Sequence, residues 1–259
     1  MTLIDSHCHL LYDKMDPPGA TMARAAEAGV RGALTINCRI EDEFPEILTV
    51  AREHRNIVCS LGTHPHESAG DREKAISEDR IVELARSDPN IVAIGETGLD
   101  YYRKFGDRDS QIELFVRQLE LAAQLDKPVV IHNREAGTDV LDILSQKIPP
   151  KGAVLHCYSE NWEYAKKALE LPIYISFAGN VTYRNARNLH ETAKNMPLER
   201  MLIESESPFM VPAAHRGERN RPSYLPETAQ FLAELRDIDE EALGDQLYAN
   251  SCEFFGLEP

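Results

Sequence analysis

Eight short apolar runs, each followed by a polar break and a segment with helical periodicity, constrain the fold of this chain more than any other feature. Runs rich in Val, Ile and Leu at successive positions are typical of parallel strands covered on both faces. Such strands, alternating with helices, predict an α/β protein. We expect strands at Leu3–His7, Ala33–Asn37, Ile57–Leu61, Ile91–Gly95, Val129–His132, Ala153–His156, Ile173–Phe177 and Met201–Ile203.

Eight units of this kind in 259 residues predict one (β/α)8 TIM barrel, because that fold takes about 250 residues. The Gly-rich turn that follows the first strand of many open nucleotide-binding sheets is absent from the sequence. We therefore expect a single barrel domain over residues 1–259. The helices are expected at Gly19–Ala28, Glu43–Glu53, Ser77–Ala85, Ser110–Leu125, Thr138–Ser145, Asn161–Leu169, Arg184–Asn195, Pro226–Arg236 and Glu240–Phe255.

Charge and composition limit the setting and the partners of the protein. The net charge is −15, so the average surface repels polyanions, and a nucleic acid would need a local positive patch. Five cysteines without a C-x-x-C pair fit a reduced, cytoplasmic protein better than a disulfide framework. We expect neither a secretory signal nor a membrane span, because no long apolar run is present. Nothing in the sequence indicates an obligate protein partner.

Polar residues that could bind metal ions follow the predicted strands directly. Six of the nine histidines lie there, at the end of a barrel where active sites are built. Imidazole and carboxylate groups suit Zn²⁺, Mn²⁺ and similar ions. A single histidine could equally be a core or surface residue, but several that end apolar strands in the same way favour a metal site. The residues concerned are His7, His9, His64, His66, Glu96, His132, His156 and Glu206.

Several motifs in the same order give the chain a family resemblance over essentially its whole length. It resembles the TatD-type metal-dependent deoxyribonucleases, a branch of the amidohydrolase superfamily. The similarity implies a barrel of the metal-dependent hydrolase type. The motifs that carry it are Asp5–His9, Gly62–His66, Ala93–Tyr101, His132–Ala136, Leu155–Ser159, Leu202–Pro208, Asn250 and Phe255–Leu257.

The resemblance also implies a site that holds two divalent metal ions, which could be Mg²⁺, Mn²⁺ or Zn²⁺. One ion would be bound by His7, His9 and Glu96, and the other by Glu96, His132 and His156. Glu206 takes the place of the family's strand-eight Asp, which binds a metal and orients the attacking water. His64 and His66 would lie near the substrate phosphate, with His64 in a catalytic role.

Two positions depart from the family pattern. Glu206 is one methylene longer than the usual Asp, and Arg221 stands where the family usually has Glu. Arg221 belongs to a basic loop with Arg216 and Arg219, and we expect these three residues and Arg134 to bind substrate phosphates.

The resemblance thus implies a phosphodiester hydrolase, a 3′-5′ exonuclease-like deoxyribonuclease whose substrate is short or single-stranded DNA. Two alternatives stay open at this point. One is a different amidohydrolase-type reaction on an ester, amide or phosphotriester, because fold and metals do not determine the substrate. The other is a metal-binding protein with little turnover, because Glu206 replaces the usual Asp.

Overall fold

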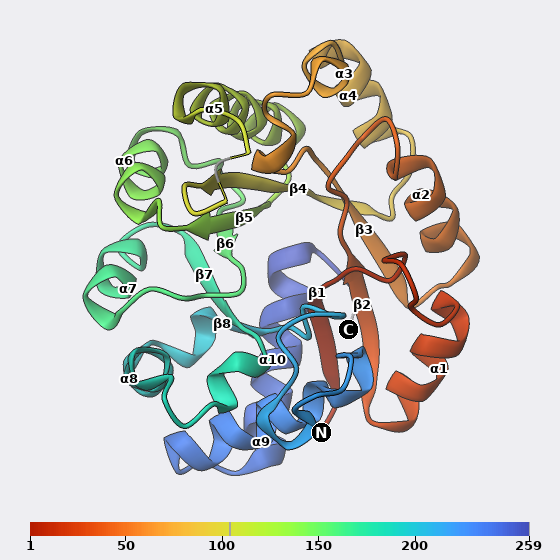
Figure 1. Ribbon diagram of the computed structural model, residues 1–259. Helices are drawn as coiled ribbons and strands as arrows, with labels where there is room; N and C mark the ends of the chain where they lie inside the picture. Colours follow the sequence, from red (N-terminus) through yellow and green to blue (C-terminus); the bar gives the residue numbers. More distant parts are fainter. Residues whose placement is uncertain (104, 259) are drawn as a thin grey trace. The chain divides into compact units, whose positions relative to one another are not determined.

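The computed structural model of the protein describes residues 1–103 and 105–258, and it contains eight strands that alternate with helices (Figure 1). All eight predicted strands are present, and three of them have the predicted ends. The strands are β1 (Leu3–Cys8), β2 (Val30–Thr35), β3 (Ile57–Leu61), β4 (Ile91–Asp100), β5 (Val129–Arg134), β6 (Ala153–Leu155), β7 (Ile173–Phe177) and β8 (Met201–Ile203).

The predicted helices are also present, most of them with ends shifted by one to three residues. They are α1 (Pro18–Glu27), α2 (Phe44–Glu53), α4 (Glu78–Arg86), α5 (Arg108–Leu125), α6 (Gly137–Lys147), α7 (Trp162–Ala168), α8 (Arg187–Asn195), α9 (Leu225–Arg236) and α10 (Glu240–Phe255). A short helix, α3 (Asp71–Lys74), was not predicted, because four residues are too few to show a helical period.

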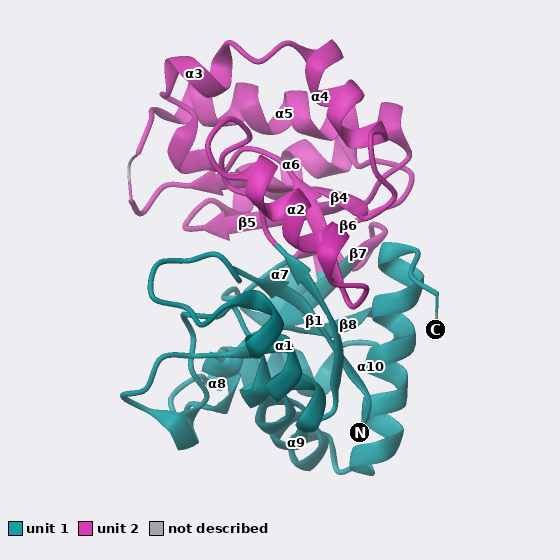
Figure 2. Cartoon of the chain, turned by 90° about the vertical axis from the view of Figure 1, so that its right-hand side faces the viewer, with its two compact units in different colours: residues 1–35, 156–166, 174–259 teal, residues 36–155, 167–173 magenta. Residues whose placement is uncertain are grey.

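The chain divides into two compact units, which Figure 2 colours teal and magenta. Unit 1 comprises residues 1–35, 156–166 and 174–259, and unit 2 comprises residues 36–155 and 167–173. In unit 2, β3 pairs in parallel with β4, β4 with β5, and β5 with β6. In unit 1, β1 pairs in parallel with β2, and β7 with β8.

Strand order confirms the (β/α)8 barrel. The strands follow one another in the sheet from β1 to β8 in sequence order. In an open sheet of that order the first and last strands would be separated. Within unit 1, however, the C-terminal end of β1 is joined to the segment that follows β8. Glu206 N donates to His7 O at 3.0 Å, and His9 N donates to Ser207 O at 2.9 Å. The single domain predicted for residues 1–259 stays a prediction.

Helix α5 buries two glutamines together with its apolar residues. Gln111 and Gln118 lie on the same buried face as Phe115, Leu119 and Ala122. Both glutamines are buried because their side-chain amides make hydrogen bonds at the C-terminal ends of strands.

The ends of β4 and β5 leave no room for a side chain at Gly98. Gly98 of β4 has φ +135°, and a Cβ atom added there would lie 2.0 Å from the carbonyl oxygen of His132 in β5. A side chain at position 98 would therefore displace His132. Among residues 1–103 and 105–258, no helix is long and apolar enough to cross a membrane.

Candidate active site

Three imidazole rings surround one carboxylate oxygen in unit 1. His7 lies on β1, His9 directly follows it, and His156 follows β6. Glu206 Oε2 lies 3.1 Å from His7 Nε2, 3.7 Å from His9 Nε2 and 4.0 Å from His156 Nδ1. The rings of His7 and His156 are stacked, with their centroids 3.9 Å apart. The structure thus brings together four of the predicted metal ligands, and we call them the unit 1 cluster.

Two further buried carboxylates, Glu204 and Asp5, form hydrogen bonds next to residues of the unit 1 cluster. We had not predicted them as site residues. Glu204 Oε1 accepts hydrogen bonds from Cys157 N at 2.8 Å and from His156 Nδ1 at 3.3 Å. Asp5 Oδ1 accepts one from Ser205 N at 2.8 Å. Burial raises the pKa of both groups, that of Asp5 to about 7. The spacing is the signal that could have identified them, because each precedes a ligand by two residues and strand side chains alternate.

The donor atoms of the unit 1 cluster suit a divalent cation. Among the residues that the structure describes, three buried carboxylate oxygens receive no hydrogen bond: Asp5 Oδ2, Glu204 Oε2 and Glu206 Oε2. The Nε2 atoms of His7 and His9 also face each other at 3.3 Å, beside Glu206 Oε2. A buried carboxylate oxygen without a donor is costly, and a cation would offset that cost. His7, His156, Glu204 and Glu206 also form one of the groups of ligand atoms close enough to hold a metal ion.

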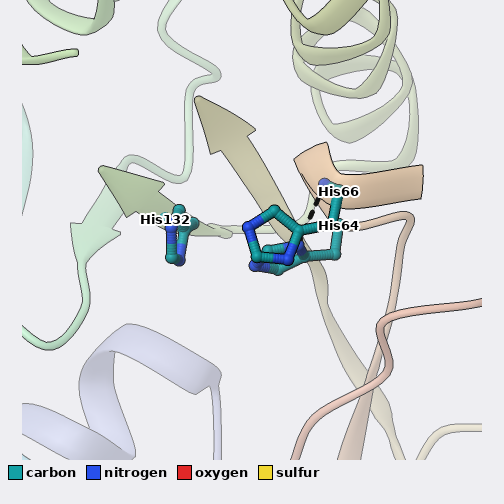
Figure 3. A group of neighbouring side chains, drawn as sticks. All are labelled: His64, His66 and His132. Carbon is teal, nitrogen blue, oxygen red and sulfur yellow. Dashed lines mark hydrogen bonds between the residues drawn. The ribbon is translucent and has the colours of Figure 1, made fainter. Parts of the chain in front are cut away.

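A second set of imidazoles and carboxylates lies in unit 2, and we call it the unit 2 cluster. Figure 3 shows His64 and His66, which follow β3, beside His132 of β5. Glu96 of β4 completes the set, because its Oε1 atom lies 2.9 Å from His132 Nδ1 and 3.3 Å from His64 Nε2. The structure therefore brings these four predicted residues together.

Asp100, at the end of β4, is a further member of the unit 2 cluster that the sequence analysis missed. Its Oδ2 atom lies 2.7 Å from His66 Nε2 and 3.2 Å from His132 Nε2. Burial alone would raise the pKa of Asp100, but the hydrogen bonds from His132 and His66 hold that pKa far below its usual range. We had expected β4 to end at Gly95, so Asp100 fell outside the predicted strand.

His132 provides the test of whether unit 2 suits a cation. Both of its ring nitrogens face carboxylate oxygens, Nδ1 toward Glu96 and Nε2 toward Asp100. With the ring neutral, one of these nitrogens carries no proton, and a cation bound to that nitrogen and its carboxylate would satisfy the second contact. His64, His66 and His132 also offer ligand atoms close enough together to hold a metal ion. The unit 2 cluster therefore also suits a divalent ion.

His64 is held in one protonation form by its neighbours. His64 Nδ1 accepts a hydrogen bond from His66 N at 3.1 Å, drawn as the dashed line in Figure 3. Burial lowers the pKa of His64 to about 4, so the ring is neutral at neutral pH. Because Nδ1 is the acceptor, the proton of the neutral ring is on Nε2, the atom that faces Glu96.

Two buried glutamines of α5 hold the strand ends that carry the unit 2 cluster. Gln111 bonds both backbone groups of Asp100, with Oε1 accepting from N at 2.8 Å and Nε2 donating to O at 3.1 Å. Gln118 bonds Thr63 in the same way, at 2.9 and 2.8 Å. Thr63 directly precedes His64. Each glutamine therefore fixes the backbone beside a residue of the cluster.

The predicted phosphate-binding arginines have aromatic or backbone partners. Arg134 of β5 lies over the ring of Tyr102, with its guanidinium carbon 4.0 Å from the ring centroid. In unit 1, Arg219 donates to the backbone carbonyl of Asp13. The corresponding ring distances are 5.7 Å for Arg216 over Tyr183 and 5.1 Å for Arg221 over Tyr224. Their role in phosphate binding stays a prediction, as does the sharing of Glu96 by two metal ions.

Comparison with known proteins identifies the family of this chain. Residues 4–256 match the family described as TatD related DNase. The chain is 35% identical to the "uncharacterized metal-dependent hydrolase YcfH" of Escherichia coli K12, over all of this chain and 97% of that protein. It is also 35% identical to the "3′-5′ ssDNA/RNA exonuclease TatD" of Shigella flexneri, over 91% of this chain and 92% of that one.

A solved structure gives the same result for the fold. The crystal structure of YjjV, a TatD homologue from E. coli K12, superposes with a TM-score of 0.89 at 29% sequence identity, covering 99% of this chain and 98% of that one. The match spans the elements that carry both clusters. From its sequence and its fold, this chain belongs to the TatD-related DNase family and is a metal-dependent hydrolase.

Proposed function

We propose that this hydrolase is a phosphodiesterase that removes nucleotides from the 3′ end of short or single-stranded DNA. The observation that carries the proposal is the unit 1 cluster, in which imidazole nitrogens of His7, His9 and His156 all lie within 4.0 Å of Glu206 Oε2. The exonuclease name of the Shigella relative supports the choice of substrate.

We propose two divalent cations as cofactors, Mg²⁺, Mn²⁺ or Zn²⁺. His7, His9, His156 and Glu206 would bind one in unit 1, and Glu96 and His132 would bind the other in unit 2. When bound, such ions supply positive charge that polarises a phosphoryl oxygen and acidifies water.

The chain's own residues would supply the proton transfers and the orientation of the phosphate. The carboxylate of Glu206 lies beside the imidazoles of the unit 1 cluster and would take a proton from the attacking water. His64 carries its proton on Nε2, and this N–H would donate to a phosphate oxygen. The 2.7 Å contact between His66 Nε2 and Asp100 Oδ2 orients the His66 ring, which would bind the phosphate beside His64.

The arginines account for nucleic acid binding by an acidic chain. Arg134, Arg216, Arg219 and Arg221 would contact phosphates of the strand, with the planar guanidinium that suits this group. Because the net charge is −15, the rest of the surface repels long polyanions. We therefore propose that short or unpaired ends are bound rather than long duplexes.

The direct test is a digestion ladder. The metal content of the purified protein is measured first. With Mg²⁺, Mn²⁺ or Zn²⁺ present, the protein should then shorten a 5′-labelled single strand one nucleotide at a time. His7→Ala should abolish the ladder, whereas the control His54→Ala, at the end of α2, should not. Turnover of a panel of esters, amides or phosphotriesters while oligonucleotides stay intact would instead favour another amidohydrolase reaction.

A metal-binding protein with little turnover is the second candidate, and the length of Glu206 favours it. A displacement of about 1 Å at a reacting group can cost roughly 100-fold in rate. If length is what limits the rate, Glu206→Asp should raise kcat on an oligonucleotide by about tenfold or more, with Glu206→Gln inactive. Absence of phosphoester cleavage in both the wild type and Glu206→Asp, with metal bound, would establish the second candidate.

We also infer a cytoplasmic setting. The five cysteines include no C-x-x-C pair, and no disulfide joins any of them in the described part of the chain, as is usual where the cell keeps proteins reduced. Fractionation of cells that make the protein tests this inference, and recovery outside the cytoplasm would refute it.

A further inference from the structure

The exposed large hydrophobic side chains of unit 1 are unevenly placed. They are Tyr12, Phe209, Met210 and Ile238 among the described residues, and the first three lie in the loops that follow β1 and β8. Tyr12 is 49% exposed and Phe209 is 42% exposed. These two loops also carry His9 and Glu206 of the unit 1 cluster. The exposed apolar surface of this unit is thus concentrated beside its candidate metal ligands.

The rings of Tyr12 and Phe209 form a defined pair. Their centroids are 5.0 Å apart, with the ring planes at 78° to each other. Phe209 in turn lies with its centroid 6.2 Å from that of His9, at 73°. Edge-to-face contacts of this kind orient rings relative to one another. The pair therefore presents an aromatic surface that begins at a candidate metal ligand.

The backbone around both rings is braced. Phe209 N donates to Glu206 O at 2.7 Å, and Asn220 Nδ2 donates to Phe209 O at 2.6 Å. Tyr12 N donates to His9 O at 3.2 Å, and Arg219 donates to the carbonyl of the next residue, Asp13. Two aromatic rings are thus held exposed on anchored loops. An exposed apolar pair on anchored loops beside candidate metal ligands forms a candidate surface for a ligand.

We propose that Tyr12 and Phe209 form a stacking subsite for a nucleobase next to the scissile phosphate. This inference rests on the proposed function and names a part of the substrate that it binds. Nucleobases stack on aromatic side chains whatever their sequence, because every base has an apolar face. The short distance from Phe209 to His9 places the subsite within the span of a single nucleotide from the unit 1 cluster. Such a subsite binds unpaired bases and excludes stacked duplex.

A second copy of the chain fits this apolar patch less well than a nucleobase does. Stable protein–protein interfaces take about 20–30 residues a side, whereas the apolar patch consists of three side chains. The patch is of the size of one or two bases. Its neighbour Arg219 adds positive charge, which suits a nucleotide rather than an apolar partner surface.

The test is a double-mutant cycle in which the aromatic ring of the protein and the nucleobase of the substrate are removed separately and together. Cleavage of a single-stranded oligonucleotide is compared with that of the same strand carrying an abasic site at either nucleotide that flanks the scissile bond. Wild type, Tyr12→Ala and Phe209→Ala are measured on each substrate as kcat/KM. Ile238→Ala, which removes an exposed hydrophobic side chain outside these loops, is the matched control.

We expect each aromatic variant to lose on the order of 10- to 100-fold in kcat/KM on the normal strand and much less on one of the abasic strands. The control should lose nothing on any strand. Equal losses on normal and abasic strands would overturn the subsite, because they would show that the rings only support the unit 1 cluster. A wild type that forms a dimer, with both aromatic variants monomeric and fully active, would also overturn it. Failure of the wild type to cleave any oligonucleotide would instead refute the proposed function.

Discussion

Replacement of Gln118 by Met tests whether a buried helix residue holds the unit 2 cluster in place. The side chain is 3% exposed and makes three hydrogen bonds, accepting from Thr63 N and donating to Thr63 O and to Thr97 Oγ1. Methionine has a similar shape but cannot replace these bonds. The variant therefore leaves the backbone N–H and C=O of buried Thr63 without their glutamine partner.

The magnitude follows from the number of groups affected. Each buried polar group left without a partner costs about 1–3 kcal/mol, so two backbone groups should lower the free energy of unfolding by about 2–6 kcal/mol. At about 2–4 °C per kcal/mol for a chain of this size, Tm should fall by roughly 4–24 °C. Because His64 directly follows Thr63, a backbone shift should also lower kcat, by about tenfold or more.

Urea unfolding followed by circular dichroism measures the change in stability, and the oligonucleotide assay measures kcat. Gln124→Met is the matched control, because Gln124 lies on the same helix but is exposed, and its effect should stay within about 0.5 kcal/mol. A Gln118→Met protein as stable and as active as this control would refute the assigned role of Gln118.

Three further predictions concern metal and substrate. Glu204→Ala should weaken metal binding in unit 1 by about 10–100-fold in a chelator competition, since His156 loses its hydrogen-bond acceptor; affinity equal to that of the exposed control Glu218→Ala would contradict this. Dialysis against EDTA should abolish activity and lower Tm, because bound ions stabilise the folded chain; full activity after verified metal loss would show that no ion is needed. Arg216→Ala should reduce the slope of log KM against log salt on single strands by about 0.7, whereas an unchanged slope would place Arg216 away from the phosphates.

Strand positions were largely predictable because buried parallel strands are almost continuously apolar. The C-terminal ends of β4 and β5 were not predictable in this way. Pairing continues there through Leu99 with Asn133 and Asp100 with Arg134, so polar residues occupy regular strand positions. Residues retained for chemistry interrupt the apolar pattern, and the predicted strands therefore ended too early.

The residues of the candidate site were also only partly predictable from the sequence. Residues of the two clusters could be identified from their place after apolar runs, although their individual roles came from the family resemblance. Glu204 was missed because its two-residue spacing from Glu206 was not used, and Asp100 was missed because the predicted strand ended at Gly95 whereas β4 continues to Asp100. Gln111 and Gln118 were missed because glutamine on a helix is ordinarily an exposed residue.

The close approach of Gly98 to the carbonyl of His132 bears on how this enzyme could be altered. Libraries that aim at new substrates can diversify the loops after β1 and β8, where side chains project outward from anchored backbone. Position 98 offers no such freedom, since even alanine would push against the main chain of a candidate ligand. We expect sequencing of active clones from an unbiased library to return glycine there and varied residues at exposed Ile238, and frequent alanine at position 98 would contradict this.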